Sequence, residues 1–134
     1  MKIKSFLLSM LLLTAATTYA QKNSLVGTWK LVSSKITMND TTSTNDDSKG
    51  ETMKIITPTH FALLSKGTDG ALQYAGGGRV TMDNRNYTET IAFFSEKSML
   101  NKVAVFTYSI EGNKCHFEGK IDDIKIDEVW EKVQ

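Results

Sequence analysis

Short strand-like runs alternate with turn residues along almost the whole chain, and this alternation constrains the fold more than any other feature. Runs of about four to eight residues rich in β-branched and aromatic types are typical of strands, and Gly, Asn, Asp and Ser clusters mark turns. The runs are residues 25–36, 52–57, 59–65, 71–83, 87–94, 102–110, 114–121 and 124–133. Because consecutive runs are joined locally, we predict an all-β, antiparallel up-and-down barrel of about eight strands.

The segments between these runs differ in character. Residues 37–49 are rich in Thr, Ser, Asn and Asp without any periodicity, which predicts the longest and most mobile loop. Residues 95–101 lack strand character and predict one short helical turn. Gly76-Gly77-Gly78 interrupts a strand, and we expect these glycines to let the strand bend or to make room for a ligand or another backbone segment.

The first twenty residues have the pattern of a secretory signal peptide. Lys2 and Lys4 precede an apolar run at residues 6–13, and small or polar residues follow as far as Ala20. The apolar run is shorter than the roughly 20 residues that a transmembrane helix needs. We therefore expect no transmembrane segment, cleavage after Ala20, and a soluble periplasmic or secreted domain at residues 21–134, which is long enough for a single core.

Charge and cysteine content narrow the functional classes. The formal net charge is +1, and it falls by two when Lys2 and Lys4 leave with the leader, so the chain lacks the clustered cationic excess of a nucleic-acid-binding surface. Cys115 is the only cysteine, so no disulfide forms within the chain, and we expect it to be buried. No cofactor motif is present, and the sequence does not identify a protein partner.

Two glutamates fall on otherwise apolar strand faces. Glu89 alternates in step with apolar residues of 87–94, and Glu128 does the same within 124–133. The shared faces are Tyr87, Glu89, Ile91 and Phe93, and Ile124, Ile126, Glu128, Trp130 and Lys132. If the apolar faces point inward, both carboxylates enter the barrel, because successive side chains of a strand point to opposite sides.

A buried carboxylate is costly unless it finds hydrogen-bond donors or a wet cavity. The candidate partners, which with Glu89 and Glu128 make up the predicted ligand-binding set, are Tyr87, His60, Arg79, Tyr74 and Tyr108. Three roles stay open for this set. It forms a satisfied internal cluster, it anchors the polar end of a small ligand, or the two carboxylates perform acid and base chemistry, as in glycoside hydrolysis.

The opening segment Leu25-Val26-Gly27-Thr28-Trp29-Lys30-Leu31 resembles the Gly-x-Trp opening of lipocalin-like proteins. Residues 54–61, 75–83, 87–91 and 127–133 extend the resemblance, which is to small exported lipocalin-like domains of unknown function common in Bacteroides-type bacteria. The resemblance implies a calycin-type barrel with a central cavity open at one end. It also implies that Trp29 closes the base, with Lys132 in the place of a cation over its ring.

Our leading hypothesis is an exported, non-enzymatic binding protein that holds a small amphiphilic or hydrophobic molecule in the barrel. The first alternative is a structural or interaction module with a filled barrel, for which Phe94, Phe106 and Tyr108 are the residues to inspect. A minor alternative is a hydrolase that uses the two carboxylates. His60 and His116 are far apart in sequence, and no metal-ligand spacing is present.

Overall fold

The computed structural model describes residues 24–133, which form nine antiparallel strands and two short 3-10 helices. The strands are β1 (Gly27–Met38), β2 (Thr41–Asp46), β3 (Glu51–Ile56), β4 (His60–Lys66), β5 (Leu72–Met82), β6 (Asn86–Phe94), β7 (Val103–Glu111), β8 (Lys114–Ile121) and β9 (Ile124–Lys132), and the 3-10 helices are η1 (Asp47–Lys49) and η2 (Lys97–Met99). The predicted signal peptide at residues 1–20 lies outside the described residues. Within residues 24–133, no helix is long and apolar enough to cross a membrane.

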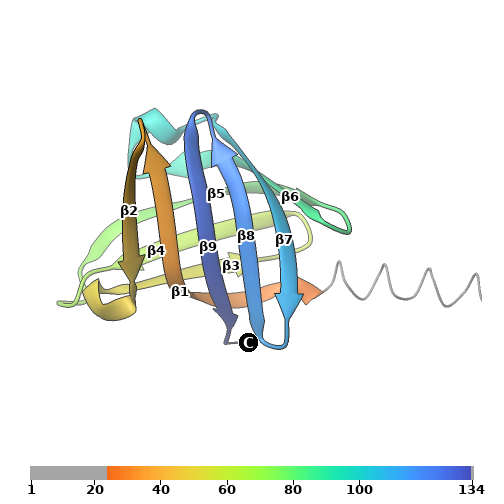
Figure 1. The fold of residues 1–134 in the computed structure, drawn as a ribbon, viewed down its shortest axis with the longest axis horizontal. Helices are drawn as coiled ribbons and strands as arrows, with labels where there is room; N and C mark the ends of the chain where they lie inside the picture. Colours follow the sequence, from red (N-terminus) through yellow and green to blue (C-terminus); the bar gives the residue numbers. More distant parts are fainter. Residues whose placement is uncertain (1–23, 134) are drawn as a thin grey trace, which may run out of the picture.

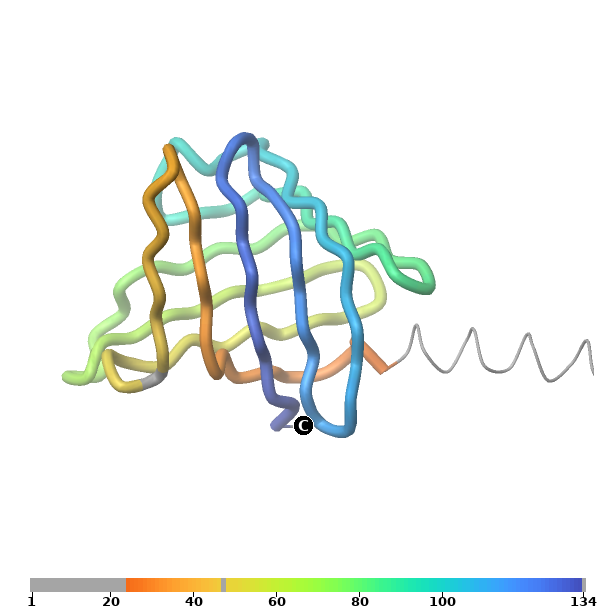
Figure 2. The backbone as a smooth tube through the Cα atoms, in the orientation of Figure 1, coloured from red at the N-terminus to blue at the C-terminus, as the bar shows by residue number. Residues whose placement is uncertain are grey.

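The strands close into a barrel. From β3 to β9 each strand pairs with the next, and β9 returns to pair with β1 from Trp29↔Lys132 to Thr37↔Lys125. In Figure 1, β1, β9, β8 and β7 stand side by side at the front, and β3 to β6 run across behind them. The tube view in Figure 2 shows the same crossing of front and rear layers. The predicted closed, antiparallel barrel of about eight strands is therefore confirmed, with β2 as an additional strand.

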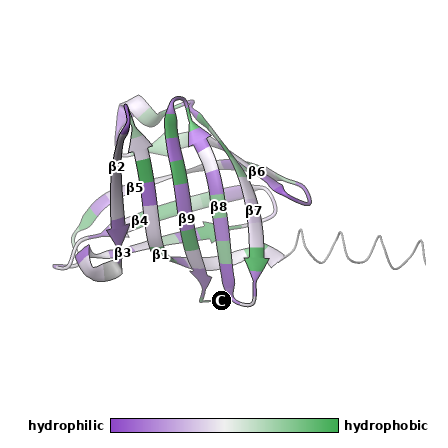
Figure 3. Cartoon of the chain, viewed as in Figure 1, coloured by the Kyte–Doolittle hydropathy of each residue, from purple (hydrophilic) through white to green (hydrophobic). Residues whose placement is uncertain are grey.

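The prediction that residues 37–49 form a loop is wrong, because this segment contains β2 and η1. β2 pairs with the second half of β1, from Ser33↔Asp46 to Met38↔Thr41, while β3 pairs with the first half of β1. Asn39 and Asp40 join β1 to β2 with φ of 49° and 62°, the left-handed geometry of a two-residue hairpin turn. All six β2 residues are exposed, so this strand carries no apolar alternation, as its lack of green in Figure 3 shows.

A β-bulge between Leu31 and Ser33 shifts the alternation in β1. The sequence pattern puts Ser33 on the inward face with Trp29, but after the bulge it is Ser34 that is buried. A second irregularity lies in the pairing of β5 with β6, where Gly77 is opposite Phe93 and Gly78 is opposite Ile91, so that β6 has one extra residue. A Cβ atom on Gly78 would collide with the backbone oxygen of Thr90, so this position requires glycine.

One end of the barrel is closed by Trp29. Its indole Nε1 donates a hydrogen bond to the Leu25 carbonyl oxygen at 2.9 Å. The Lys132 Nζ lies 5.3 Å from the centre of the Trp29 ring and donates to the Ser24 carbonyl oxygen at 3.0 Å. The expected cation over the ring is therefore present, and the resulting cation–π contact and hydrogen bond tie the end of β9 to the start of the barrel.

The hydrophobic core leaves part of the barrel interior unfilled. Tyr87, Phe106 and Phe117 contact one another through ring centres 5.2 to 6.3 Å apart, and Cys115 is fully buried beside them, as expected. Burial raises the pKa of the Cys115 thiol to about 12, which keeps the thiol protonated. Packing is therefore concentrated around these rings, and space is left elsewhere in the interior.

Candidate functional site

The open half of the barrel contains a cavity of about 440 Å³. Its mouth is formed by strand ends and loops far from Trp29, including Lys49, Glu51, Lys66 and Phe94. The walls are mainly apolar and are contributed by Leu31, Ile36, Leu63, Ile91, Phe106 and Ile126. The first alternative hypothesis required a barrel interior that is filled by side chains. The cavity shows that the interior is not filled.

The floor of the cavity contains a buried ion pair. The Lys54 Nζ lies 2.7 Å from the Glu89 Oε1, and the two side chains are only 4% and 7% exposed. Lys54 comes from β3 and Glu89 from β6, strands that are not neighbours in the sheet, so the pair bridges the barrel interior. A buried ion pair of this kind adds little net stability, but either partner left alone becomes an uncompensated charge.

The Lys54 ammonium is also surrounded by aromatic rings. It lies 5.0 to 6.0 Å from the ring centres of Phe61, Tyr87, Phe106, Phe117 and Trp130. Burial alone would lower the pKa of Lys54, but the Glu89 and Glu128 carboxylates outweigh burial and raise this pKa above its ordinary value. Lys54 is therefore a charged group whose ionic and cation–π interactions are supplied by the protein itself.

Glu128 is the second carboxylate of the floor. The Trp130 Nε1, two residues along β9, donates a hydrogen bond to the Glu128 Oε2 at 2.9 Å. The side chain is half-buried because it borders the cavity. Burial raises the pKa of Glu128 above its ordinary value, and the neighbouring Lys54 charge only partly opposes this effect.

Tyr87 is fully buried and does not border the cavity. Burial, and then the negative charge of the nearby Glu89 carboxylate, raise the pKa of its phenol, so that the phenol stays neutral. Tyr87 therefore contributes to the packing around Lys54 and Glu89 rather than to the cavity wall.

The structure separates the predicted ligand-binding residues into groups. Glu89, Glu128 and Tyr74 border the cavity, and Tyr74 stacks on Phe94 at the mouth with ring centres 6.1 Å apart. Tyr108 is buried and donates its hydroxyl hydrogen to the Asp83 carbonyl oxygen at 2.8 Å, away from the cavity.

Two of the residues named as candidate partners of the carboxylates do not border the cavity. His60 and Arg79 are exposed and are paired with each other across β4 and β5. Their neighbours Phe61 and Val80 are the buried residues, so alternation turns His60 and Arg79 outward. Neither side chain contributes to the cavity.

The end of β6 corrects a third expectation. Phe93 was expected to share the inward face with Glu89, but the irregular pairing after Ile91 turns Phe93 outward, where it is 72% exposed. Phe94 is turned inward instead and packs against the core. Phe106 and Tyr108 are buried, so the three residues named for an interaction patch do not form one.

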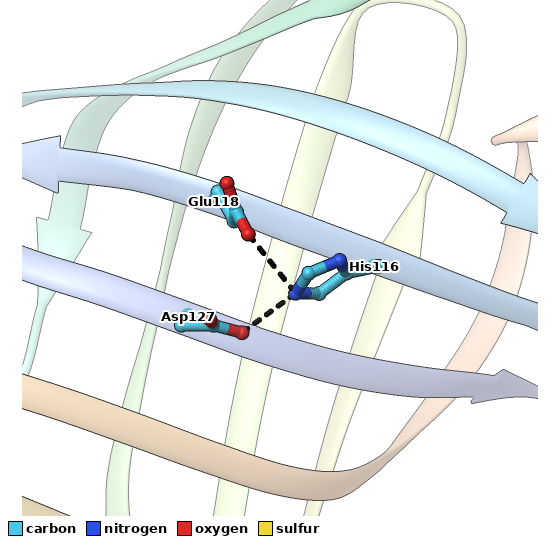
Figure 4. Close-up of side chains that lie close together, drawn as sticks. All are labelled: His116, Glu118 and Asp127. Atoms are coloured by element: carbon cyan, nitrogen blue, oxygen red, sulfur yellow. Dashed lines mark hydrogen bonds and ion pairs between the residues drawn. The ribbon is translucent and has the colours of Figure 1, made fainter.

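A separate polar cluster lies on the outer face of β8 and β9, as Figure 4 shows. The His116 Nε2 lies 2.7 Å from the Asp127 Oδ1 and 3.6 Å from the Glu118 Oε1. A metal ion accepts ligands of these types, and the sequence spacing did not reveal the group because Asp127 comes from the neighbouring strand. All three side chains are substantially exposed, and the His116–Asp127 hydrogen bond accounts for their arrangement.

Comparisons with known proteins bear on the fold. No family model matches this chain, and no curated protein matches it. A lipocalin-like protein from Bacteroides uniformis is similar in structure, with a TM-score of 0.53 and 12% sequence identity over 81% of this chain and 98% of that chain. The chain has a lipocalin-like fold. Fatty-acid-binding protein 1 of Echinococcus granulosus matches with a TM-score of 0.44 and 14% identity, over 84% of this chain and 99% of that chain.

The buried pair predicts a non-additive effect on stability. Lys54→Met leaves the Glu89 charge buried without its partner, so we expect the free energy of unfolding to fall by about 3–5 kcal/mol. The double variant Lys54→Met/Glu89→Leu removes both charges, and we expect it to recover most of that loss. Urea unfolding at constant pH measures both values. The exposed Lys125→Met is the control, and a double variant no more stable than Lys54→Met would contradict the prediction.

The raised pKa of Glu128 predicts a pH-dependent effect on stability. Just above the ordinary glutamate pKa, the native protein retains a proton that the unfolded chain has released. The Glu128 contribution to the free energy of unfolding therefore falls as the pH rises through this window. We expect Glu128→Gln to remove that fall, which urea unfolding of both proteins between about pH 4 and pH 8 will measure. The exposed Glu96→Gln should follow the wild-type curve, and a Glu128→Gln curve parallel to wild type would refute the assignment.

Proposed function

We propose that this protein binds a small, partly apolar molecule inside its barrel. The observation that carries the proposal is a cavity of about 440 Å³ with mainly apolar walls and a small charged floor at Lys54, Glu89 and Glu128. Small-molecule sites are typically cavities of about 300–1,000 Å³ in which a few polar groups fix the orientation of a ligand held by apolar walls. The apolar part of the ligand contacts the walls, and its polar end reaches the floor.

The same geometry favours binding over hydrolysis. A carboxylate that serves as nucleophile or base needs a free oxygen, whereas the Glu89 Oε1 is held by Lys54 at 2.7 Å. In Glu128 only one oxygen is held, by the Trp130 indole, so it is the pairing of Glu89 with Lys54 that removes the second carboxylate a two-carboxylate mechanism requires. A binding role uses both carboxylates as they stand, so it requires no rearrangement of the floor.

A pair of tryptophan substitutions tests the cavity. Leu63→Trp adds bulk to a wall residue, while Leu64→Trp adds the same bulk on the outer face of β4, where Leu64 is 43% exposed. We expect wild type and Leu64→Trp to bind the neutral fluorescent probe 1-aminoanthracene equally, and Leu63→Trp to bind it at least about tenfold more weakly, which corresponds to about 1.4 kcal/mol. Fluorescence titration measures the affinities, and thermal melting confirms that both variants are folded. Equal binding by the two variants would exclude the cavity as the site.

We further propose that the domain at residues 21–134 works in the periplasm or outside the cell. The support is the pattern of residues 1–20, with two lysines before an apolar run and a small-residue end at Ala20.

Export predicts a defined mature N-terminus. When the whole chain is produced in a Gram-negative host, we expect the intact mass of the periplasmic protein to correspond to a start at Gln21. Replacing Leu11 and Leu12 with Arg interrupts the apolar run, so this control should remain uncleaved. A full-length wild-type product retained in the cytoplasm would refute the proposed location.

A further inference from the structure

We propose that the polar end of the bound molecule is an amine, which binds as an ammonium ion at Glu128, and that the cavity discriminates against carboxylates. This inference rests on the proposed function and assigns the class of ligand to it. It follows from the charges of the cavity floor, from their existing partners, and from the aromatic surface beside them.

Among the residues that the structure describes, Lys54 is the only lysine on the floor, and its charge is already neutralised. Lys54 lies 2.7 Å from Glu89 and is enclosed by five aromatic rings, so its ionic and cation–π interactions are made within the protein. To bind Lys54, a ligand carboxylate would have to compete with Glu89. It would also approach Glu128, and two carboxylates in one enclosed site repel each other.

Glu128 differs from Glu89 and Lys54 because it can still accept hydrogen bonds. The Trp130 indole donates to its Oε2, and within residues 24–133 no hydrogen bond is made to its other oxygen. Glu128 borders the cavity, which places its carboxylate within reach of a ligand. A ligand that donates hydrogen bonds and carries positive charge matches an acceptor of this kind, because charge-assisted hydrogen bonds are the stronger ones.

The surroundings of Glu128 also suit a cation. Phe106 and Trp130, two of the rings around Lys54, also border the cavity, and an aromatic ring attracts ammonium groups. When ionised, Glu89 and Glu128 together exceed the charge of Lys54 by one negative unit, which an ammonium ion beside Glu128 offsets.

The charges at the mouth of the cavity do not reverse the preference for an ammonium ion over a carboxylate. Lys66 is paired with Glu51 through atoms 3.8 Å apart, and Lys49 lies beside Asp46 in the chain segment that borders the cavity. Each lysine at the mouth therefore has an acid near it, and the mouth offers no excess of positive charge that would retain an anionic ligand. The selectivity is set at the floor.

A series of ligands with one chain length and different polar ends tests the inference. Decylamine and decanoate below their micelle concentrations, and 1-decanol below its solubility limit, are each titrated at pH 7.5 in competition with 1-aminoanthracene. We expect decylamine to bind at least about tenfold more tightly than decanoate, with 1-decanol between them. This comparison uses only the wild-type protein, so it does not depend on the folding of any variant.

A matched pair of variants assigns the preference to Glu128. In Glu128→Gln we expect the affinity for decylamine to fall about tenfold and the affinity for 1-decanol to stay within about twofold. Asp127→Asn removes the adjacent carboxylate on the outer face, and we expect it to keep the wild-type preference. Equal loss in both variants, or no loss in Glu128→Gln, would overturn the assignment to Glu128.

The outcomes also separate this inference from the proposed function. If decanoate binds most tightly, the inference is overturned while ligand binding in the barrel stands. If wild type binds neither 1-aminoanthracene nor any of the three decyl compounds, the proposed function fails and the inference fails with it.

Discussion

The pairing of β9 with β1 is the constraint on which the rest of the structure depends. It converts a row of locally linked antiparallel strands into a closed barrel, so β1 and β9 leave no free edge where they meet. Closure also brings Trp29 of β1, the first strand, into contact with Lys132 of β9, the last strand, at the closed end of the barrel. Only a closed sheet gives Glu89 and Glu128, which come from different parts of the barrel, a shared interior in which their charges interact with one lysine.

Strand order and the inward glutamates were predictable because they follow from local turns and a period of two. The alternation fails where a strand contains a bulge, since one extra residue reverses every side chain beyond it. Phe93 was misplaced for this reason, and in β1 the alternation that starts at Trp29 fails at Ser33. β2 escaped prediction for a different reason. It is polar on both faces, so nothing in its pattern distinguishes it from a loop except the Asn39-Asp40 turn.

Lys54 is the site residue that the sequence did not reveal. In β3, Lys54 shares one face with Ile56, while Met53 and Ile55 share the other. Both faces carry apolar residues, so the sequence does not show which of them points into the barrel. Its partner Glu89 is distant in sequence and lies on a strand that is not adjacent to β3 in the sheet. A contact of this kind follows from the curvature of the whole barrel and not from local pattern. The outward direction of His60 and Arg79, in contrast, is visible once Phe61 and Val80 are recognised as core residues.

The buried ion pair has a consequence for specificity that a pair of apolar residues would not have. Replacing such a pair with apolar residues is often neutral for stability, so stability alone does not account for it. In this barrel, Glu89 pairs with Lys54, the one buried cation within residues 24–133, and an anionic ligand would have to compete with Glu89 for it. Trp130 holds Glu128 through one oxygen, and within residues 24–133 no hydrogen bond is made to the other oxygen of this side chain, which borders the cavity. The floor therefore presents an acceptor instead of a cation, although the total charge of the three ionised side chains differs from neutrality by only one unit.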